Sequence, residues 1–320
     1  MRDDSVSLAT IQAARQRLKG VAHQTPLLES TWLNHASTHR VFLKSEHLQR
    51  VGAFKFRGAF NAAAQLTPDE LPKGLITQSS GNHAQALALT ARLLQTSAHI
   101  IMPSNAPTPK IDAVGEYGAK IHFCNPSVED RERLLRSIES QTEAVYIPPY
   151  DHPSVISGQG TIGLEILDAL PDLNAIITPV GGGGLLSGVA TAVKCSAPHI
   201  KVFGAEPLGA DDAARSLSTG KLIPQTSPQT IADGLLTSLG SHTWPLISRY
   251  VDDIITVSED EIISAMRNTW ERTKQLIEPS AAVAVAALLS DRFLRDDNDK
   301  KIAVVLSGGN VDLARLPWGT

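Results

Sequence analysis

Lys55 is the first residue of this chain whose surroundings suit covalent chemistry. It stands between Phe54 and Phe56 in the segment VGAFKFRGAF. An amine packed against apolar rings loses hydration, which lowers its pKa and makes the neutral, nucleophilic form accessible, as Schiff-base formation requires. Taken alone, Lys55 is better explained as a lysine whose stem packs on the rings while its amine reaches solvent. The nucleophile hypothesis therefore depends on other segments.

A run of four glycines, Gly181, Gly182, Gly183 and Gly184, lies between the apolar segment AIITPV and LLSGVATAVK. We expect a strand, a turn and a helix that begins near Leu185. Backbone N–H groups can converge in such a turn and the helix N-terminus adds partial positive charge, so a phosphate is the expected ligand. The alternative is a tight turn, but four glycines carry an entropic cost that packing alone does not explain. No GK[ST] follows, which excludes a P-loop.

Other sequence patterns associated with catalysis are weak. Gly158, Gly160 and Gly163 match GxGxxG, but they follow loop residues and not a strand end, so we interpret the match as chance. The histidines show no HExxH or comparable ligand spacing, and no GxSxG elbow is present. Neither a zinc protease nor an α/β-hydrolase is indicated.

Apolar segments rich in β-branched residues recur along the chain and must supply the framework. They are VFLK at 41, GLITQ at 74, AHIIMP at 98, AKIHFC at 119, AVYIPP at 144, AIITPV at 175, KVFGAE at 201 and KIAVVLSGG at 300. Because helical stretches separate them, the pattern predicts a parallel α/β sheet. Polar or glycine-rich clusters end three of these strands, at residues 78–83, 181–184 and 307–310. Ligands bind beyond the carboxyl ends of strands in such sheets, so we expect the site there.

The composition excludes several classes of function. The 320 residues carry 29 basic and 33 acidic side chains, a net charge of −4 that predicts no nucleic-acid or membrane partner. The N-terminal 20 residues read as an amphipathic helix and lack the apolar core of a signal peptide, so we expect a cytoplasmic enzyme. Cys124 and Cys195 form no CxxC motif, which fits a reducing compartment, and we expect both to be buried packing residues.

Six motifs, in order along nearly the whole chain, resemble those of the fold-type II pyridoxal phosphate (PLP) enzymes, and within them the serine racemase and threonine dehydratase group. They are AFKFRGA at 53–59, SSGNHAQA at 79–86, GQGTIGLE at 158–165, PVGGGGLLSG at 179–188, IADG at 231–234 and SGGNVDL at 307–313. The resemblance implies a tryptophan synthase β-like fold, with two open parallel-sheet α/β domains and the cofactor between them. The larger domain would comprise residues 1–70 and 150–320, the smaller one 71–149, and the family suggests a homodimer.

The resemblance also implies roles in binding PLP. Lys55 would hold the cofactor as a Schiff base and later act as a base, while Phe54 lies against the pyridine ring. The glycine run would bind the phosphate, Gly234 would line the cofactor site, and Asn82 would hydrogen-bond the ring hydroxyl. Ser307 would face the pyridine nitrogen; its alternative is the first residue of a turn. A neutral hydroxyl there makes the ring a weaker electron sink and favours prompt loss of a β-hydroxyl.

The same resemblance places Ser79, Asn82 and His83 around the substrate carboxylate, with Arg131 as a second anchor. Each has an alternative: SSGNH could form only a turn and a helix cap, and Arg131 could belong to the solvated face of a charged helix. Ser80 would lie on the face of the substrate opposite Lys55. Racemisation requires a proton donor on that face, so Ser80 favours racemase capability.

The resulting hypothesis is dehydration of L-serine or L-threonine to the 2-oxo acid and ammonia, with serine racemisation through Lys55 and Ser80. A dedicated 3-hydroxyaspartate dehydratase, or an amino-acid racemase, is the alternative within the fold; the dehydratase should need an extra cation for the distal carboxylate. A non-catalytic amino-acid or phosphate sensor is disfavoured, because it needs no pair of proton-transfer groups. The chain ends soon after SGGNVDL, so we expect no C-terminal regulatory domain.

A divalent-cation site is also implied by resemblance, in the segment GAEPLGADDA. Glu206, the carbonyl of Ala210 and Asp212 offer hard oxygen ligands that suit Mg²⁺, Mn²⁺ or Ca²⁺. The alternative is an acidic surface loop. We expect the cation to have a structural role.

Overall fold

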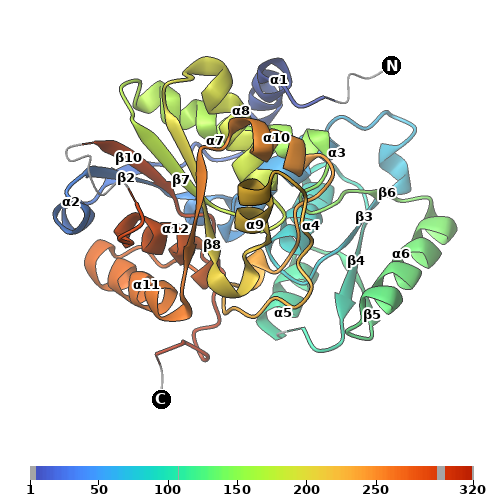
Figure 1. Cartoon of the computed structure of the whole chain (residues 1–320). Coiled ribbons are helices and arrows are strands. Elements are labelled where there is room, and N and C mark those ends of the chain that lie inside the picture. The colour runs from blue at the N-terminus through green and yellow to red at the C-terminus, as the bar shows by residue number, and fades with distance from the viewer. Residues whose placement is uncertain (1–4, 107, 294–299, 319–320) are drawn as a thin grey trace.

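The computed structural model describes residues 5–106, 108–293 and 300–318. This part of the chain forms two β-sheets that are almost entirely parallel, and each sheet carries helices on both faces (Figure 1). The prediction of two parallel-sheet α/β domains is therefore confirmed. The predicted domain limits stay a prediction.

The larger sheet has six strands in the order β1-β2-β10-β7-β8-β9. Only the β1–β2 pair is antiparallel. The central strand β10 is buried on both sides, as expected of a strand inside a parallel sheet. The bounds are β1 Leu27–Glu29, β2 Arg40–Lys44, β7 Ala175–Pro179, β8 Lys201–Pro207, β9 Asp253–Val257 and β10 Lys301–Val305.

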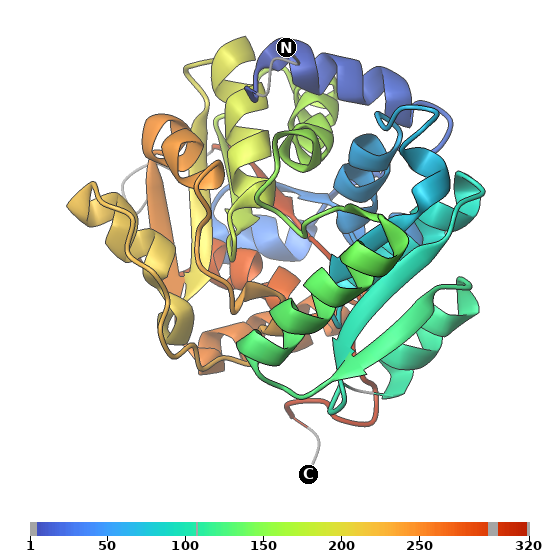
Figure 2. The ribbon, with the colours of Figure 1, turned by 90° about the vertical axis from the view of Figure 1, so that its right-hand side faces the viewer.

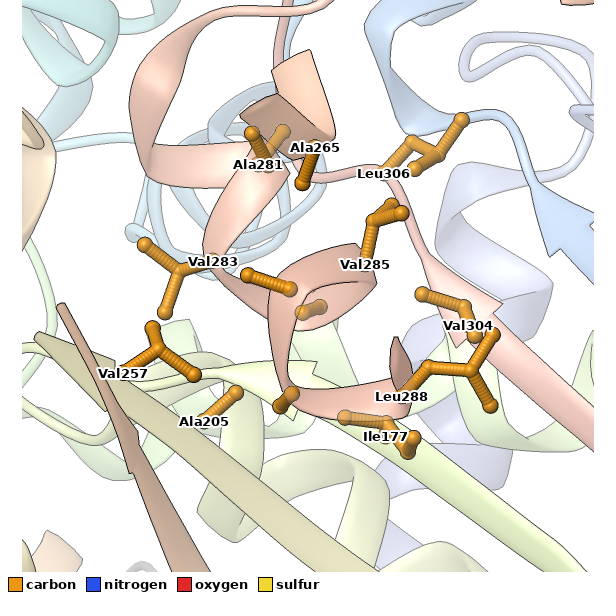
Figure 3. Close-up of a cluster of buried hydrophobic side chains, with 14 of the residues drawn as sticks. Ile177, Ala205, Val257, Ala265, Ala281, Val283, Val285, Leu288, Val304 and Leu306 are labelled. Carbon is orange, nitrogen blue, oxygen red and sulfur yellow. The ribbon is translucent and has the colours of Figure 1, made fainter. Parts of the chain in front are cut away.

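Two groups of helices cover the larger sheet. Ile302 and Val304 of β10 share one core with α2, α11 and α12, whereas Ala303 and Val305 share the opposite core with α7, α8 and α10. Helix α12, PSAAVAVAALL, has apolar residues all round and is buried in the first core (Figure 3). The bounds are α2 Thr31–Ser37, α7 Pro153–Ala169, α8 Gly184–Ser196, α10 Thr243–Tyr250, α11 Glu259–Thr273 and α12 Pro279–Leu289.

The smaller sheet has four parallel strands in the order β5-β4-β3-β6. Helices α3 and α4 pack on one face with Leu75 and Ile100, and α6 packs on the other with Ile76 and Ile101 (Figure 2). The bounds are β3 Leu75–Gln78, β4 Ala98–Pro103, β5 Lys120–Cys124, β6 Val145–Tyr146, α3 Lys55–Ala63, α4 Asn82–Leu93, α5 Thr108–Glu116 and α6 Val128–Thr142.

The N-terminal helix predicted from the sequence is confirmed as α1, Leu8–Leu18. Ser7 and Thr10 form a reciprocal cap at its start, and Ile11, Ala14 and Leu18 are its buried face. The remaining helix of the larger domain is α9, Asp212–Thr219. No helix of the described residues is long and apolar enough to cross a membrane.

Two parts of the sequence analysis need correction, and a third is supported. The two edge strands β1 and β9 were not among the predicted strands. Cys195 is exposed and Cys124 only half-buried, so the expectation that both are buried packing residues is wrong. The chance interpretation of GxGxxG is supported, because Gly158, Gly160 and Gly163 all lie inside α7. There a Cβ on Gly158 would lie 2.6 Å from the carbonyl of Arg57, so this glycine permits α3 and α7 to pack closely.

Candidate active site

A cavity of about 480 Å³ lies where the carboxyl ends of the two sheets face each other, a volume typical of small-molecule sites. Its lining includes every residue predicted to bind cofactor or substrate: Phe54, Lys55, Ser79, Ser80, Asn82, His83, Arg131, Gly181, Gly182, Gly183, Gly184, Gly234 and Ser307. Segments more than 250 residues apart therefore meet at one site. Their individual roles stay predictions.

Lys55 is the first residue of α3 and its amine lies at the cavity wall. The Nζ atom donates to the carbonyl of Pro149 at 2.8 Å and lies 5.2 Å from the centre of the Phe54 ring. Loss of hydration lowers the pKa of Lys55 to about 8, although the carboxyl of Glu278 opposes this shift. A substantial fraction of the amine is therefore neutral near physiological pH, as expected of a nucleophile.

The residues around Lys55 are fixed to the end of β10. The N–H of Phe54 donates to the carbonyl of Ser307 at 3.0 Å, and Ala53 forms an isolated antiparallel bridge with Gly308. Ser307 is 3% exposed. This backbone pairing holds the lysine and the predicted partner of the pyridine nitrogen in one rigid unit.

A buried ionic cluster holds the other side of α3. Arg57 makes paired hydrogen bonds to Glu46, both at 2.8 Å, and to Glu165, at 2.6 and 2.9 Å. Lys44 donates to Glu165 at 2.6 Å and to the carbonyl of Thr25 at 2.7 Å. The cluster ties β2, α3 and α7 together, so α3 has little freedom to move.

The glycine loop is shaped by close contacts at each of its positions. A Cβ on Gly182 would lie 2.4 Å from the Tyr150 ring, and one on Gly181 would lie 2.8 Å from the backbone of Leu235. Gly183 has a φ of +87° and caps α8, which begins at Gly184. Packing and backbone conformation thus account for the whole run, contrary to the sequence argument. The phosphate prediction rests instead on the N-terminus of α8 facing the cavity.

Asn82 and Glu278 form a hydrogen-bonded centre across the cavity. Asn82 Nδ2 donates to Glu278 Oε1 at 2.8 Å, and Asn310 donates from Nδ2 to Asn82 Oδ1 at 2.9 Å and from its backbone N–H to Glu278 Oε2 at 3.1 Å. Burial raises the pKa of Glu278 to about 8, and the nearby carboxylate of Asp233 adds to the rise. Glu278 can therefore hold a proton near neutral pH.

The segment SSGNH passes from β3 into α4, so the predicted turn before a helix is confirmed; Gly81 occupies the cap position and no side chain caps the helix. The carboxylate role of the segment stays a prediction. Asn82 begins the helix. The N–H of Ala84 already donates to the carbonyl of Gly81 at 3.1 Å, so the N–H groups of Asn82 and His83 are the ones that can receive a carboxylate. His83 Nε2 lies 2.9 Å from the carbonyl of Ile147 and must donate to it. Burial, followed by the charge of Lys55, lowers the pKa of His83 to about 3, so its ring is neutral.

Arg131 faces the cavity from α6. Its Nε is buried and has no hydrogen-bond partner. A buried donor without a partner is costly, so a bound anion would satisfy it. This observation favours the carboxylate anchor over the solvated helix face.

The predicted metal ligands lie outside this cavity. Glu206 and Asp212 are 0% and 1% exposed, so the alternative of an acidic surface loop is not supported. Glu206 accepts from the N–H groups of Ala213 and Ala214, and Asp212 accepts from that of Leu239. Burial is the main reason why the pKa of Glu206 rises to about 9 and that of Asp212 to about 6; Asp212 also raises that of Glu206. A cation would relieve this repulsion, so the residues fit a divalent ion.

Sequence reasoning missed several cavity residues, among them the polar residues Tyr150, Glu278, Lys110 and Asp233. Tyr150 packs on the glycine loop, and Lys110 of α5 pairs with Asp233 across the cavity. Asp233 lies within the quoted IADG motif, but its partner is 123 residues away. Only Asp233 carried a sequence signal.

Comparison with known proteins identifies the family. The model of the "pyridoxal-phosphate dependent enzyme" family matches residues 18–308. The chain belongs to this family. It is 47% identical to human serine racemase over 319 residues, which cover 98% of this chain and 94% of the human protein.

Solved structures of the family have the same fold as this enzyme. The crystal structure of serine racemase from Dictyostelium discoideum has a TM-score of 0.93 and 44% identity, with 96% of this chain and 99% of that one covered. The crystal structure of the T.th. threonine deaminase has a TM-score of 0.91 and 42% identity, with 97% and 100% covered. The fold-type II assignment is confirmed.

The residues of the cavity fit PLP, the cofactor of this family. Lys55 offers an amine of low pKa, the N-terminus of α8 offers a phosphate site, and Ser307 lies in the wall beside Phe54. The cavity is also large enough for the cofactor together with a small amino acid. The protein is therefore a PLP-dependent enzyme.

Proposed function

We propose that this enzyme dehydrates L-serine and L-threonine to the 2-oxo acid and ammonia, and that it also interconverts the enantiomers of serine. The observation that carries the proposal is the meeting of Lys55, with its low pKa, and Ser80 in one cavity. The similarity to serine racemases and to a threonine deaminase supports the same substrate class.

Lys55 acts as the base in the proposed reaction. PLP, when bound, supplies the electron sink that acidifies the α-proton of the amino acid. Lys55 Nζ can accept this proton because burial lowers its pKa to about 8. The carbonyl of Pro149, 2.8 Å from Nζ in this structure, orients the amine.

The α-carboxylate of the substrate binds at the start of α4. The N–H groups of Asn82 and His83, the hydroxyl of Ser79 and the unpartnered Nε of Arg131 provide the donors. Asn82 joins this region to Glu278 and contributes to the cofactor site. His83, neutral and bound to Ile147, serves mainly to shape the pocket.

Ser80 donates the proton on the second face during racemisation. Ser307 would hold the pyridine nitrogen of PLP with a neutral hydroxyl, so the cofactor would be a weaker electron sink and elimination would be favoured. Both activities therefore follow from the same residues. A pure phosphate or amino-acid sensor would not need the pair of Lys55 and Ser80.

A divalent cation at Glu206, the carbonyl of Ala210 and Asp212 supports this site from outside. The residue following Asp212 in the helix, Ala213, binds Glu206, so the cation stabilises the start of α9. The N–H of Leu239 donates to Asp212. Shortly after Leu239, the hydroxyl of Thr243 donates to the carbonyl of Gly182 and so supports the glycine loop. We assign the cation a structural role.

We also propose a cytoplasmic homodimer, with residues 1–70 and 150–320 as the larger domain and 71–149 as the smaller.

The absorbance spectrum of the purified protein, together with product assays on L-serine, L-threonine and 3-hydroxyaspartate, tests the proposal. We expect an absorbance band at the edge of the visible range. Lys55→Ala should abolish this band, whereas Lys19→Ala, a change at an exposed lysine, should preserve it. Keto acid and D-serine should both form from L-serine. The absence of both products from a holoenzyme with an intact band would contradict the proposed substrate class, and exclusive turnover of 3-hydroxyaspartate would favour the alternative.

A further inference from the structure

Two histidines of the smaller sheet lie side by side, although 23 positions separate them in the sequence. His99 belongs to β4 and His122 to β5, and Nδ1 of His99 lies 3.0 Å from Nε2 of His122. The two rings are nearly parallel, with 13° between their planes and 5.3 Å between their centres. Neither histidine lines the active-site cavity, so the proposed reaction gives this pair no role.

The pairing of the two strands fixes this arrangement. His122 lies opposite Ile101, and His99 precedes Ile101 by two positions, so both imidazoles project from the same face of the sheet. Strand β5 is the edge strand of this sheet (Figure 1). His99 is 6% exposed, whereas His122 is only half-buried. An ion can therefore reach the pair from the edge of the sheet.

The separation of the two nitrogen atoms suits a shared metal ion. Zinc binds histidine nitrogen at about 2.0–2.1 Å, so two such nitrogens on a tetrahedral ion lie roughly 3.3 Å apart. The observed 3.0 Å is close to this value, and a small rotation of either ring removes the difference. Within the pair, one ring must donate a proton to the other. Moving this proton to the second nitrogen of its own ring frees both lone pairs without releasing a proton.

The charge state of the pair also suits metal binding. Burial is the main reason why the pKa of each imidazole lies below its ordinary value, so both rings are neutral at physiological pH. Lys120 of β5 lowers both pKa values as well, and its positive charge opposes the approach of a cation. Among the described residues no group of three or more metal-ligating side chains is found, so water must complete the coordination.

We propose that His99 and His122 bind a divalent transition metal that prefers nitrogen ligands, such as Zn²⁺ or Ni²⁺. Imidazole suits these ions, whereas Mg²⁺ and Ca²⁺ prefer oxygen ligands. The histidine pair therefore differs in selectivity from the proposed oxygen site at Glu206 and Asp212. Because the bound ion joins β4 to the edge strand β5, it stabilises the smaller sheet.

The test is a calorimetric titration of the holoenzyme with ZnCl₂, and separately with NiCl₂, in the presence of excess Mg²⁺. The Mg²⁺ keeps the oxygen site occupied. We expect His122→Gln to weaken the binding of both ions at least about tenfold, because even residues that only support a metal ligand contribute about 10–100-fold. His35→Gln, at an exposed histidine of α2, is the matched control and should bind both ions as the wild type does.

Two further measurements make the test specific. Lys120→Gln should tighten the binding of Zn²⁺, because it removes a positive charge beside the pair. Zn²⁺ added with excess Mg²⁺ should also raise the melting temperature of the wild type and of His35→Gln, and should raise that of His122→Gln less.

Two outcomes would overturn the inference. In the first, His122→Gln binds Zn²⁺ and Ni²⁺ as tightly as the wild type, which would place the ions elsewhere on the molecule. In the second, neither ion binds to the wild type, which would make the histidine pair a hydrogen bond between two strands and nothing more. Both outcomes are independent of the proposed reaction, because the titrations contain no substrate.

Discussion

Arg57, two residues after Lys55, makes two parallel hydrogen bonds of 2.8 Å from its guanidinium to the carboxylate of Glu46. Both side chains are almost completely buried, at 1% and 0% exposure. Burying charges is costly, and such a pair is tolerated only when its hydrogen bonds are satisfied. Arg57 and Glu46 therefore hold the start of α3 in place, at the cost of sensitivity to the loss of either partner.

Glu46→Gln tests this sensitivity. It leaves Arg57 and Lys44 with a single carboxylate, that of Glu165, and we expect a loss of about 3–5 kcal/mol in the free energy of unfolding. The midpoint of urea unfolding, followed by tryptophan fluorescence, measures the loss. Glu29→Gln removes the same charge from an exposed pair with Arg40 and should leave the midpoint unchanged. Equal midpoints for the two variants would show that the buried cluster does not stabilise the fold.

The pH dependence of cofactor binding should report the pKa of Lys55. Covalent attachment needs the neutral amine, and burial lowers the pKa of Lys55 to about 8. The rate at which the apoenzyme binds PLP should therefore rise with pH and level off above about 8. The reaction of PLP with Nα-acetyl-lysine is the reference; its rate should continue to rise toward the ordinary lysine pKa of about 10.4. Stopped-flow absorbance distinguishes the two profiles, and a shared profile would contradict a low pKa.

Glu278→Gln should move that profile in a defined direction. The pKa of Glu278 is about 8, so its ionised form is populated in the pH range of this profile; that form favours the charged amine of Lys55 and raises the pKa of Lys55. Removing this charge lowers the pKa further, so the midpoint of the rate profile should shift below that of the wild type. A shift to higher pH would contradict the electrostatic assignment.

Much of the site could be predicted because many of its residues lie in short motifs that are continuous in the sequence. Lys55, Ser80, Gly234 and Ser307 each lie in a short motif that resembles a motif of the family, and this resemblance, more than the residue types alone, predicted that they lie at the site. Glu278 gives no such signal. It precedes α12 in the chain, and its role arises from hydrogen bonds to Asn82 and Asn310, which are distant in sequence.

Other differences have equally specific causes. Strand β1 has three residues, too few for a periodic pattern. Strand β9 begins at Asp253, directly after Asp252, and these acidic residues mask its apolar run. Cys195 lies near the end of α8 on its exposed side, and no spacing rule reveals that. The sequence alone could not decide whether the four glycines serve packing or ligand binding, because the close approach of Tyr150 to Gly182 is visible only in the structure.

Gly182→Ala should weaken both the fold and cofactor binding. Its new Cβ would lie 2.4 Å from the Tyr150 ring, so the loop or the ring must move, at a cost of about 1–3 kcal/mol. Gly115→Ala is the control: this helical position has open space around it, and alanine there should stabilise by about 0.5–1 kcal/mol. Thermal unfolding and PLP titration measure both effects. Combining Gly182→Ala with Tyr150→Ala should recover part of the lost stability.

Mg²⁺ should raise the melting temperature of the enzyme if Glu206 and Asp212 bind it. Binding to the folded state alone stabilises by mass action, so the shift should grow with the Mg²⁺ concentration. Glu206→Gln and Asp212→Asn should lose the response, whereas Asp211→Asn should keep it, because Asp211 pairs with Arg215. If chelation changes neither the melting temperature nor the activity of the wild type, the metal assignment is withdrawn.

Ser80→Ala separates the two proposed activities. Racemisation needs a proton donor on each face of the α-carbon, whereas elimination needs Lys55 and an acid for the leaving hydroxyl. Since a positioned acid or base contributes about 10²–10⁴-fold, the ratio of D-serine to pyruvate formed from L-serine should fall by at least about 10². Chiral chromatography and a keto-acid assay measure it in one sample.

The control for this variant is Ser104→Ala, at an exposed serine after β4 that does not line the active-site cavity. It should leave the product ratio unchanged. Solvent deuterium incorporation gives a second readout, because loss of the Ser80 hydroxyl should slow exchange from D-serine more than from L-serine. A Ser80→Ala enzyme that interconverts the enantiomers at the original ratio would show that the second proton donor is another group. Ser79 and Tyr150, two of the other hydroxyl-bearing residues that line the cavity, would then be the first to substitute.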